Sequence, residues 1–128
     1  MKAKWLSRDL INNPLYFTLC TSQEILIREL KRAKCETFEG ITKGKGATTN
    51  FIHNLNGETV AIVCLYDHKH DLPQILSLLV HEAVHIWQKI KEIIGEEKPS
   101  AEFEAYSIQQ ISQQLFYEYK RQRNTKKK

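Results

Sequence analysis

The sequence predicts an α+β fold in which a small antiparallel sheet packs on helices. Apolar residues recur at helical spacing in three segments, and two β-favouring runs around a turn predict a hairpin. The helices are expected at residues 22–34, from a cap at Asp71 to about Ile94, and after Ser100, and the strands at residues 48–53 and 59–66. The chain has 128 residues and 41% hydrophobic content, so we expect one domain over residues 1–119 with a modest core.

The first helix is expected at residues 22–34. Thr21 and Glu24 have the spacing of a capping box, in which two side chains satisfy backbone N–H groups at the start of a helix. The hairpin follows a flexible loop at residues 43–46. Its second strand is apolar on both faces over residues 60–65 and should be central, whereas the more polar first strand should lie at an edge.

The second expected helix carries the motif His81-Glu82-Ala83-Val84-His85. Asp71 can cap this helix, and Pro73 suits its first turn. The segment is apolar nearly all round, which predicts a helix buried in the middle of the domain. Its polar side chains are gathered into one row: Ser77, His81, His85 and Gln88.

The spacing of the motif suits a metal ion. His81 and His85 project from one face a turn apart, so both imidazoles can reach one ion. Glu82 lies about 100° further round the helix, where it can take a proton from a water polarised by the metal and return it to a leaving amine. The bland alternative is a pair of hydrogen-bonded core histidines beside a chance glutamate.

A hydrolytic zinc site usually has three protein ligands, so a third donor is needed. Glu102 and Glu104 are the candidates, because they follow Gly95, which suits a helix end, and Ser100, which suits the next helix cap. The connection is long enough to return Glu102 to the metal. Alternatively, Glu102 is a first-turn acid favoured by the helix dipole.

The residues HEAVH at 81–85 and EFEAY at 102–106 resemble the gluzincin zinc metallopeptidases, in which a glutamate on a following helix completes the site. The E-x-x-A spacing is similar to that of membrane-bound zinc peptidases that process prenylated proteins, where the first glutamate is the ligand. Those families have an aspartate where this chain has Tyr106. Residues 78–110 resemble more closely small zinc peptidases encoded by phages and prophages.

The resemblance implies a minimal zincin-like domain with one zinc ion held by His81, His85 and Glu102. It implies a peptidase that uses Glu82 as general base and binds an extended peptide at the edge strand of the hairpin. Two histidines and a carboxylate also suit iron, but a glutamate next to the first histidine favours zinc. The residue that stabilises the transition state stays open among Tyr106, Tyr66, His53, His68 and His70.

The charge distribution and the cysteine content indicate which binding partners and which cellular location to expect. The segment from Lys120 onward carries six positive charges, and subtracting them from the net charge of +4 leaves −2 for the body of the chain. We expect residues 120–128 to be a disordered tail, with weak nucleic-acid contact as one possible role. Three widely spaced cysteines argue against a disulfide framework. No secretory signal and no apolar run long enough to span a membrane is found in the sequence, so a cytoplasmic location is expected.

One rival hypothesis comes from another class of protein. A zinc-stabilised module could bind a protein or nucleic acid without catalysis, but such sites are usually closed by four protein ligands and have no need of Glu82. A second rival keeps the hydrolase and changes the bond that is cleaved, for example to a non-peptide amide. The sequence does not identify the substrate or the oligomeric state.

Overall fold

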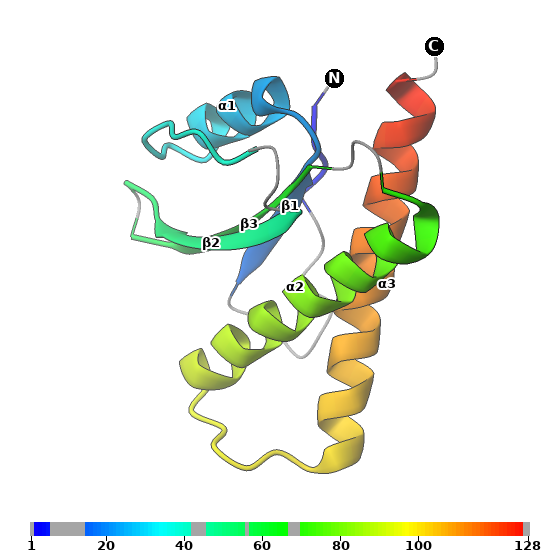
Figure 1. Cartoon of the computed structure of the whole chain (residues 1–128). Coiled ribbons are helices and arrows are strands. Elements are labelled where there is room, and N and C mark those ends of the chain that lie inside the picture. Colours follow the sequence, from blue (N-terminus) through cyan, green and yellow to red (C-terminus); the bar gives the residue numbers. More distant parts are fainter. Residues whose placement is uncertain (1, 6–14, 42–45, 56, 67–69, 127–128) are drawn as a thin grey trace.

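The computed structural model describes residues 2–5, 15–41, 46–55, 57–66 and 70–126 of the chain. It confirms the α+β class, with three strands and three helices in the described residues (Figure 1). In chain order the elements are β1 (Tyr16–Cys20), α1 (Gln23–Arg32), β2 (Ala47–His53), β3 (Thr59–Leu65), α2 (Leu72–Ile93) and α3 (Ala101–Lys126).

The strands form one sheet in the order β1-β3-β2. β2 and β3 make the predicted antiparallel hairpin, with Ala47 opposite Leu65 and His53 opposite Thr59. The prediction of a wholly antiparallel sheet was wrong, because β1 pairs with β3 in parallel. A parallel pair needs a long crossover connection, and the chain between β1 and β3 supplies one that includes α1.

The central strand β3 is buried on both faces, as its apolar run predicts. Ala61, Val63 and Leu65 join a core with α2 and α3, while Ile62 and Cys64 join a second core with α1. The sheet therefore has α1 over one face and the pair α2 and α3 over the other (Figure 1). β2 lies at the edge, as expected from its more polar sequence.

Most of the expected helix boundaries are confirmed. Asp71 caps α2 through a reciprocal capping box with Gln74, and Gly95 follows the end of α2 with a φ of 73°. The Ser100 hydroxyl oxygen accepts a hydrogen bond from the Phe103 N–H at 3.2 Å and caps α3. The cap of α1 was predicted one residue too early, because Ser22 accepts from the Ile25 N–H.

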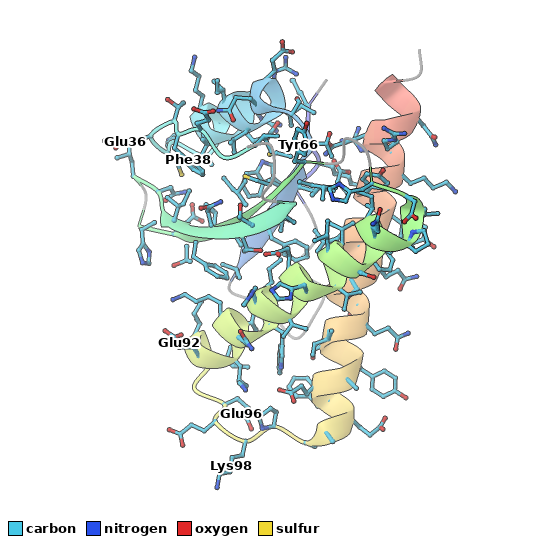
Figure 2. The ribbon with its side chains drawn as sticks, in the orientation of Figure 1. Glu36, Phe38, Tyr66, Glu92, Glu96 and Lys98 are labelled. Atoms are coloured by element: carbon cyan, nitrogen blue, oxygen red, sulfur yellow. The ribbon has the colours of Figure 1, made fainter. Side chains whose placement is uncertain are left out.

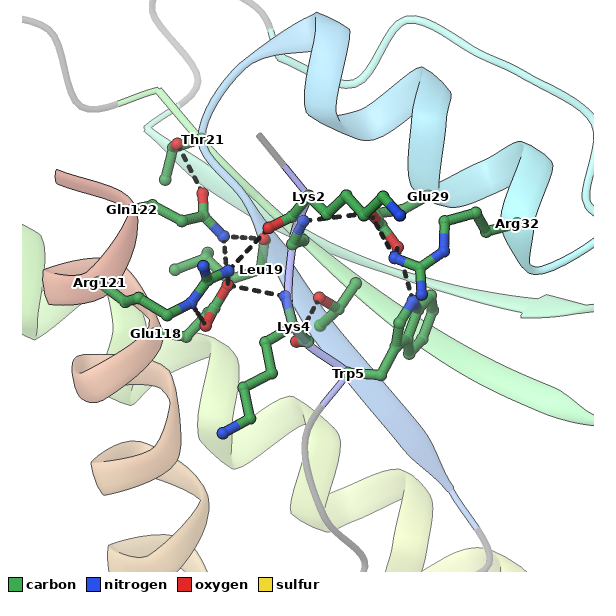
Figure 3. Close-up of polar contacts among 12 residues, drawn as sticks. Lys2, Lys4, Trp5, Leu19, Thr21, Glu29, Arg32, Glu118, Arg121 and Gln122 are labelled. Atoms are coloured by element: carbon green, nitrogen blue, oxygen red, sulfur yellow. Dashed lines mark hydrogen bonds and ion pairs between the residues drawn. The ribbon is translucent and has the colours of Figure 1, made fainter. Parts of the chain in front are cut away.

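Thr21 has a tertiary role instead of a capping role. Its hydroxyl donates to Gln122 Oε1 at 2.7 Å across the molecule. Gln122 is 0% exposed and also donates to the Leu19 carbonyl oxygen at 2.7 Å, so it ties α3 to β1 (Figure 3). α3 therefore continues to Lys126, past the boundary expected at residue 119, and the basic segment begins within this helix.

Two buried carboxylates hold the amino-terminal residues 2–5 between α1 and α3 (Figure 3). Glu118 accepts from the Lys4 N–H at 2.9 Å, from Arg121 and from Gln122. Glu29 accepts from the Ala3 N–H at 3.1 Å, from Trp5 Nε1 at 2.7 Å and from Arg32. These charges are tolerated in the interior because several donors surround each of them.

We expect Glu118→Ala to lower the free energy of unfolding by about 2–4 kcal/mol, because the Lys4 N–H, Arg121 and the buried amide of Gln122 lose their acceptor. The exposed loop residue Glu97 is the control, and Glu97→Ala should change stability by less than about 0.5 kcal/mol. Urea denaturation followed by circular dichroism measures both values. Equal effects of the two substitutions would show that the network contributes nothing to stability.

The buried thiols predict a loss of stability at alkaline pH. Burial raises the pKa of the Cys64 thiol to about 12 and also raises the pKa of Cys20. Above about pH 8.5 the unfolded chain loses thiol protons that the folded chain keeps, so the free energy of unfolding should fall as pH rises from there toward 12.

Cys64→Ala isolates one of these thiols. Between pH 8.5 and 10 its free energy of unfolding should fall by about 1–2 kcal/mol less than that of the wild type. Parallel pH profiles of the two proteins in urea denaturation would contradict this assignment.

Candidate metal centre

His81 and His85 lie side by side on one face of α2. Their Nε2 atoms are 3.1 Å apart, and their rings meet edge to face with centroids separated by 4.8 Å. Both side chains are exposed, as are Ser77 and Gln88 in the same row. The expectation that α2 is buried all round was therefore wrong, because the polar row faces outward while the opposite side packs on the sheet.

The histidine pair fits two ligands of a tetrahedral metal ion. Zinc–nitrogen bonds of about 2.0–2.1 Å at a tetrahedral angle place two nitrogens about 3.3 Å apart, close to the separation of His81 and His85. Two imidazole nitrogens this close need a proton or a cation between them, because their lone pairs would otherwise repel. His85 Nδ1 lies 3.2 Å from Gln88 Oε1, and donation to this oxygen leaves the lone pair on Nε2 for a metal.

Glu82 differs from the histidines in its surroundings. Its side chain is 4% exposed, and Oε1 accepts a hydrogen bond from the Thr49 hydroxyl at 2.7 Å. Thr49 belongs to the edge strand β2, so this bond joins α2 to the sheet at the level of the motif. A carboxylate has two oxygens, so the bond to Thr49 orients one and leaves the other for a proton.

No sequence motif singles out Thr49 as a candidate site residue. A signal was present, because strand alternation puts Thr49 and Phe51 on the same face of β2. Phe51 lies on the α2 side of the sheet, with Lys89 Nζ 5.8 Å from its ring centroid. However, sequence alone did not show which α2 side chain would meet Thr49.

A cavity of about 700 Å³ opens beside the motif. It reaches both His81 and Glu82, so a small molecule in it has access to the proposed base. The described residues that line it come from the start of β2, from the residue just before the α2 cap and from the first half of α2: Ala47, His70, Pro73, Gln74, Ser77, Leu78, His81 and Glu82.

Glu102 does not join the histidines. In the part of the chain that the structure describes, no three His, Cys, Asp or Glu side chains are grouped so that they could hold a metal ion. Glu102 is exposed in the first turn of α3, whereas Glu104 Oε2 accepts from Trp87 Nε1 at 2.8 Å and lies 3.6 Å from Lys91 Nζ. Two residues correspond to about 200° on a helix, so the turn that points Glu104 at α2 points Glu102 away from it.

The residues considered for transition-state stabilisation are scattered. Tyr106 is 64% exposed on α3, and His53 Nδ1 pairs with the Thr59 hydroxyl at 3.0 Å. Tyr66 directly follows β3. In Figure 2 it lies in the upper part of the view, whereas Glu92 and Glu96 lie in the lower part, near the turn from α2 to α3. His68 lies outside the described residues. Of the four candidates that lie in the described residues, only His70 lines the cavity beside Glu82.

Comparisons with protein-family models, with curated proteins and with solved structures find no match. The predicted membership of the gluzincin metallopeptidases, and of the small phage peptidases among them, was wrong. The finding that overturns it is that the described residues contain no group of three side chains able to hold a metal ion. Among the same residues, no helix is long and apolar enough to cross a membrane.

Proposed function

We propose that this chain is a zinc-dependent hydrolase that acts on peptide bonds, with Glu82 as general base. The observation that carries the proposal is the 3.1 Å approach of His81 Nε2 to His85 Nε2 beside the buried carboxylate of Glu82. Zinc at this pair would supply a Lewis acid that polarises a water molecule. The proposal concerns the chemistry of these residues and makes no claim of family membership.

In this proposal the protein positions a proton acceptor and a substrate. Glu82 takes a proton from the attacking water and passes it to the leaving nitrogen. Thr49 holds Glu82 Oε1, so the carboxylate keeps one orientation while the proton moves through its other oxygen. Because Glu82 is almost fully buried, water competes little for the carboxylate.

The edge position of β2 supports a peptide as substrate, bound as zincin-like enzymes bind an extended peptide. β2 is an edge strand beside the histidine-bearing helix, so its outer backbone groups can pair with an extended peptide. A groove of about 690 Å³ is lined by residues 34–38 and by residues 49–53 of β2. A peptide there would pass Thr49, which contacts the proposed base.

Glu102 is the third ligand that the sequence predicts, but in the structure it is exposed on the first turn of α3 and apart from the histidines, so zinc affinity has to test it. Purified protein should contain about one zinc per chain by elemental analysis. We expect His81→Ala and His85→Ala each to weaken zinc binding at least about 10-fold in competition with a chelating dye, and Glu102→Ala to do the same if it is a ligand.

Two controls accompany the zinc measurements. His53→Ala and Glu97→Ala remove a histidine and a carboxylate that lie outside the motif helix and should leave the affinity unchanged. Unchanged affinity in Glu102→Ala would assign the third position to another donor. A protein that takes up no zinc would refute both the zinc-dependent hydrolase and the zinc-stabilised module.

Glu82→Gln tests the general base. The amide keeps the size of the side chain and the bond from Thr49 but cannot accept the proton, so peptide hydrolysis should fall at least about 100-fold while zinc binding is retained. Cleavage of a mixed peptide library, read by mass spectrometry, measures the loss. Glu97→Gln is the matched control, and full activity in Glu82→Gln would refute the role of Glu82.

A further inference from the structure

The helix α3 has an exposed face opposite the face that packs in the core. Ile111, Leu115 and Tyr119 are buried against α2 and β1. Around the other side of the helix, exposed side chains recur at steps of three or four residues and form one row, the α3 stripe: Glu102, Tyr106, Gln109, Gln113, Tyr117 and Lys120. The stripe covers five helical turns, or about 27 Å. Figure 1 shows α3 along one side of the molecule, with α1 and β2 on the other side.

The α3 stripe has the composition of a protein interface. No charged residue occurs from Ala105 to Tyr117, although 27% of the chain is charged. Tyr106 and Tyr117 are each 64% exposed, so two large aromatic rings face water about three turns apart. Tyrosine is enriched, and charge is depleted, at the centre of protein–protein interfaces. The middle of the stripe therefore suits contact with another protein, and charges are found only at its two ends.

The order of side chains along the α3 stripe is self-complementary. Read from either end, it gives a charged residue, a tyrosine and a glutamine before the middle is reached. In an antiparallel pair of identical helices, a twofold axis brings each residue opposite the one at the same distance beyond the axis. With the axis at the height of Ile111, the facing residues of the two copies are Glu102 with Lys120, Tyr106 with Tyr117, and Gln109 with Gln113.

Each of these three contacts is chemically favourable. Opposite charges meet at both ends, and none of the ion pairs among the described residues already engages Glu102 or Lys120. Two tyrosine rings can meet edge to face. A glutamine amide both donates and accepts hydrogen bonds, so two of them can pair with each other. A parallel pairing would instead place Glu102 against Glu102 and Lys120 against Lys120, where like charges repel.

We propose that the α3 stripe is the contact surface of a homodimer in which two copies of α3 pack antiparallel about a twofold axis. A second copy of this chain is the partner, because the complementary charges, Glu102 and Lys120, lie at opposite ends of the same stripe. Each copy contributes a single helix, so the interface is small and the dimer should be in reversible equilibrium with the monomer. The inference goes beyond the proposed hydrolase function and does not depend on zinc.

Sedimentation velocity of the full chain at about 5–500 μM measures this self-association. The wild type should change from monomer to dimer within that range. Glu102→Lys and Lys120→Glu should each weaken dimerisation at least about 10-fold, because two symmetry-related ion pairs become repulsive. Glu97→Lys and Lys98→Glu make the same charge changes in the exposed loop before α3 and should dimerise as the wild type does. A wild type that stays monomeric throughout would overturn the proposal.

Mixing the two charge variants tests the antiparallel arrangement. In an equimolar mixture of Glu102→Lys with Lys120→Glu, both positive positions of one chain face both negative positions of the other, so a heterodimer should form. The double variant Glu102→Lys/Lys120→Glu should again form a homodimer, because the two charges have exchanged places. A charge effect that is not transmitted across this contact gives neither rescue. Failure of both the mixture and the double variant to dimerise would overturn the proposal.

Two further measurements test the middle of the stripe and the independence from metal. Tyr117→Ser removes an exposed ring and should weaken dimerisation at least about 10-fold, whereas Leu55→Ser, at a side chain that is 86% exposed between β2 and β3, should have no effect. Equal behaviour of these two variants would overturn the role of the stripe. Excess EDTA should leave the dimer intact. Dissociation in EDTA would show that a metal ion shared between two copies holds them together, and it would also overturn the proposal.

Discussion

The burial of β3 on both faces is the constraint on which the rest of the structure depends. A strand with apolar side chains on both sides needs a cover on each, and α1 and the pair α2 and α3 supply the two covers. α2 meets this demand with Leu79, Ala83 and Ile86 on one side. At 3.6 residues per turn, His81 and His85 then face outward, and Glu82 lies between the core side and the exposed side.

Three buried carboxylates differ in how many hydrogen-bond donors surround them. Glu29 and Glu118 are each surrounded by several donors from the amino-terminal residues and from their own helices. Glu82 receives one side-chain hydrogen bond, from Thr49, among the described residues and lies in the wall of a cavity. A carboxylate whose oxygens are all hydrogen-bonded stabilises a fold, whereas one with remaining acceptor capacity can take a proton, and this difference is why the proposed general base is Glu82 and not Glu29 or Glu118.

Two of the three proposed metal ligands, His81 and His85, lie together in the described part of the chain, and the third, Glu102, lies apart from them. The i, i+4 spacing brings His81 and His85 together without help from the rest of the chain, because both belong to one helix. A third donor depends on how α3 docks on α2, and this docking is set by Trp87, which packs edge to face on Phe103 and donates to Glu104. These contacts orient the first turn of α3 so that Glu104, and not Glu102, faces α2.

By itself the sequence determined the local features: the hairpin, the Asp71 cap, the helix end before Gly95 and the convergence of His81 and His85. Each depends on residues within a few positions of one another, where backbone geometry leaves few alternatives. Only the tertiary structure decided the parallel strand β1, the exposure of the histidine row, the Thr49 bond to Glu82 and the position of Glu102. These features join segments far apart in the chain, and their arrangement follows from packing and from buried hydrogen bonds, which sequence spacing does not encode.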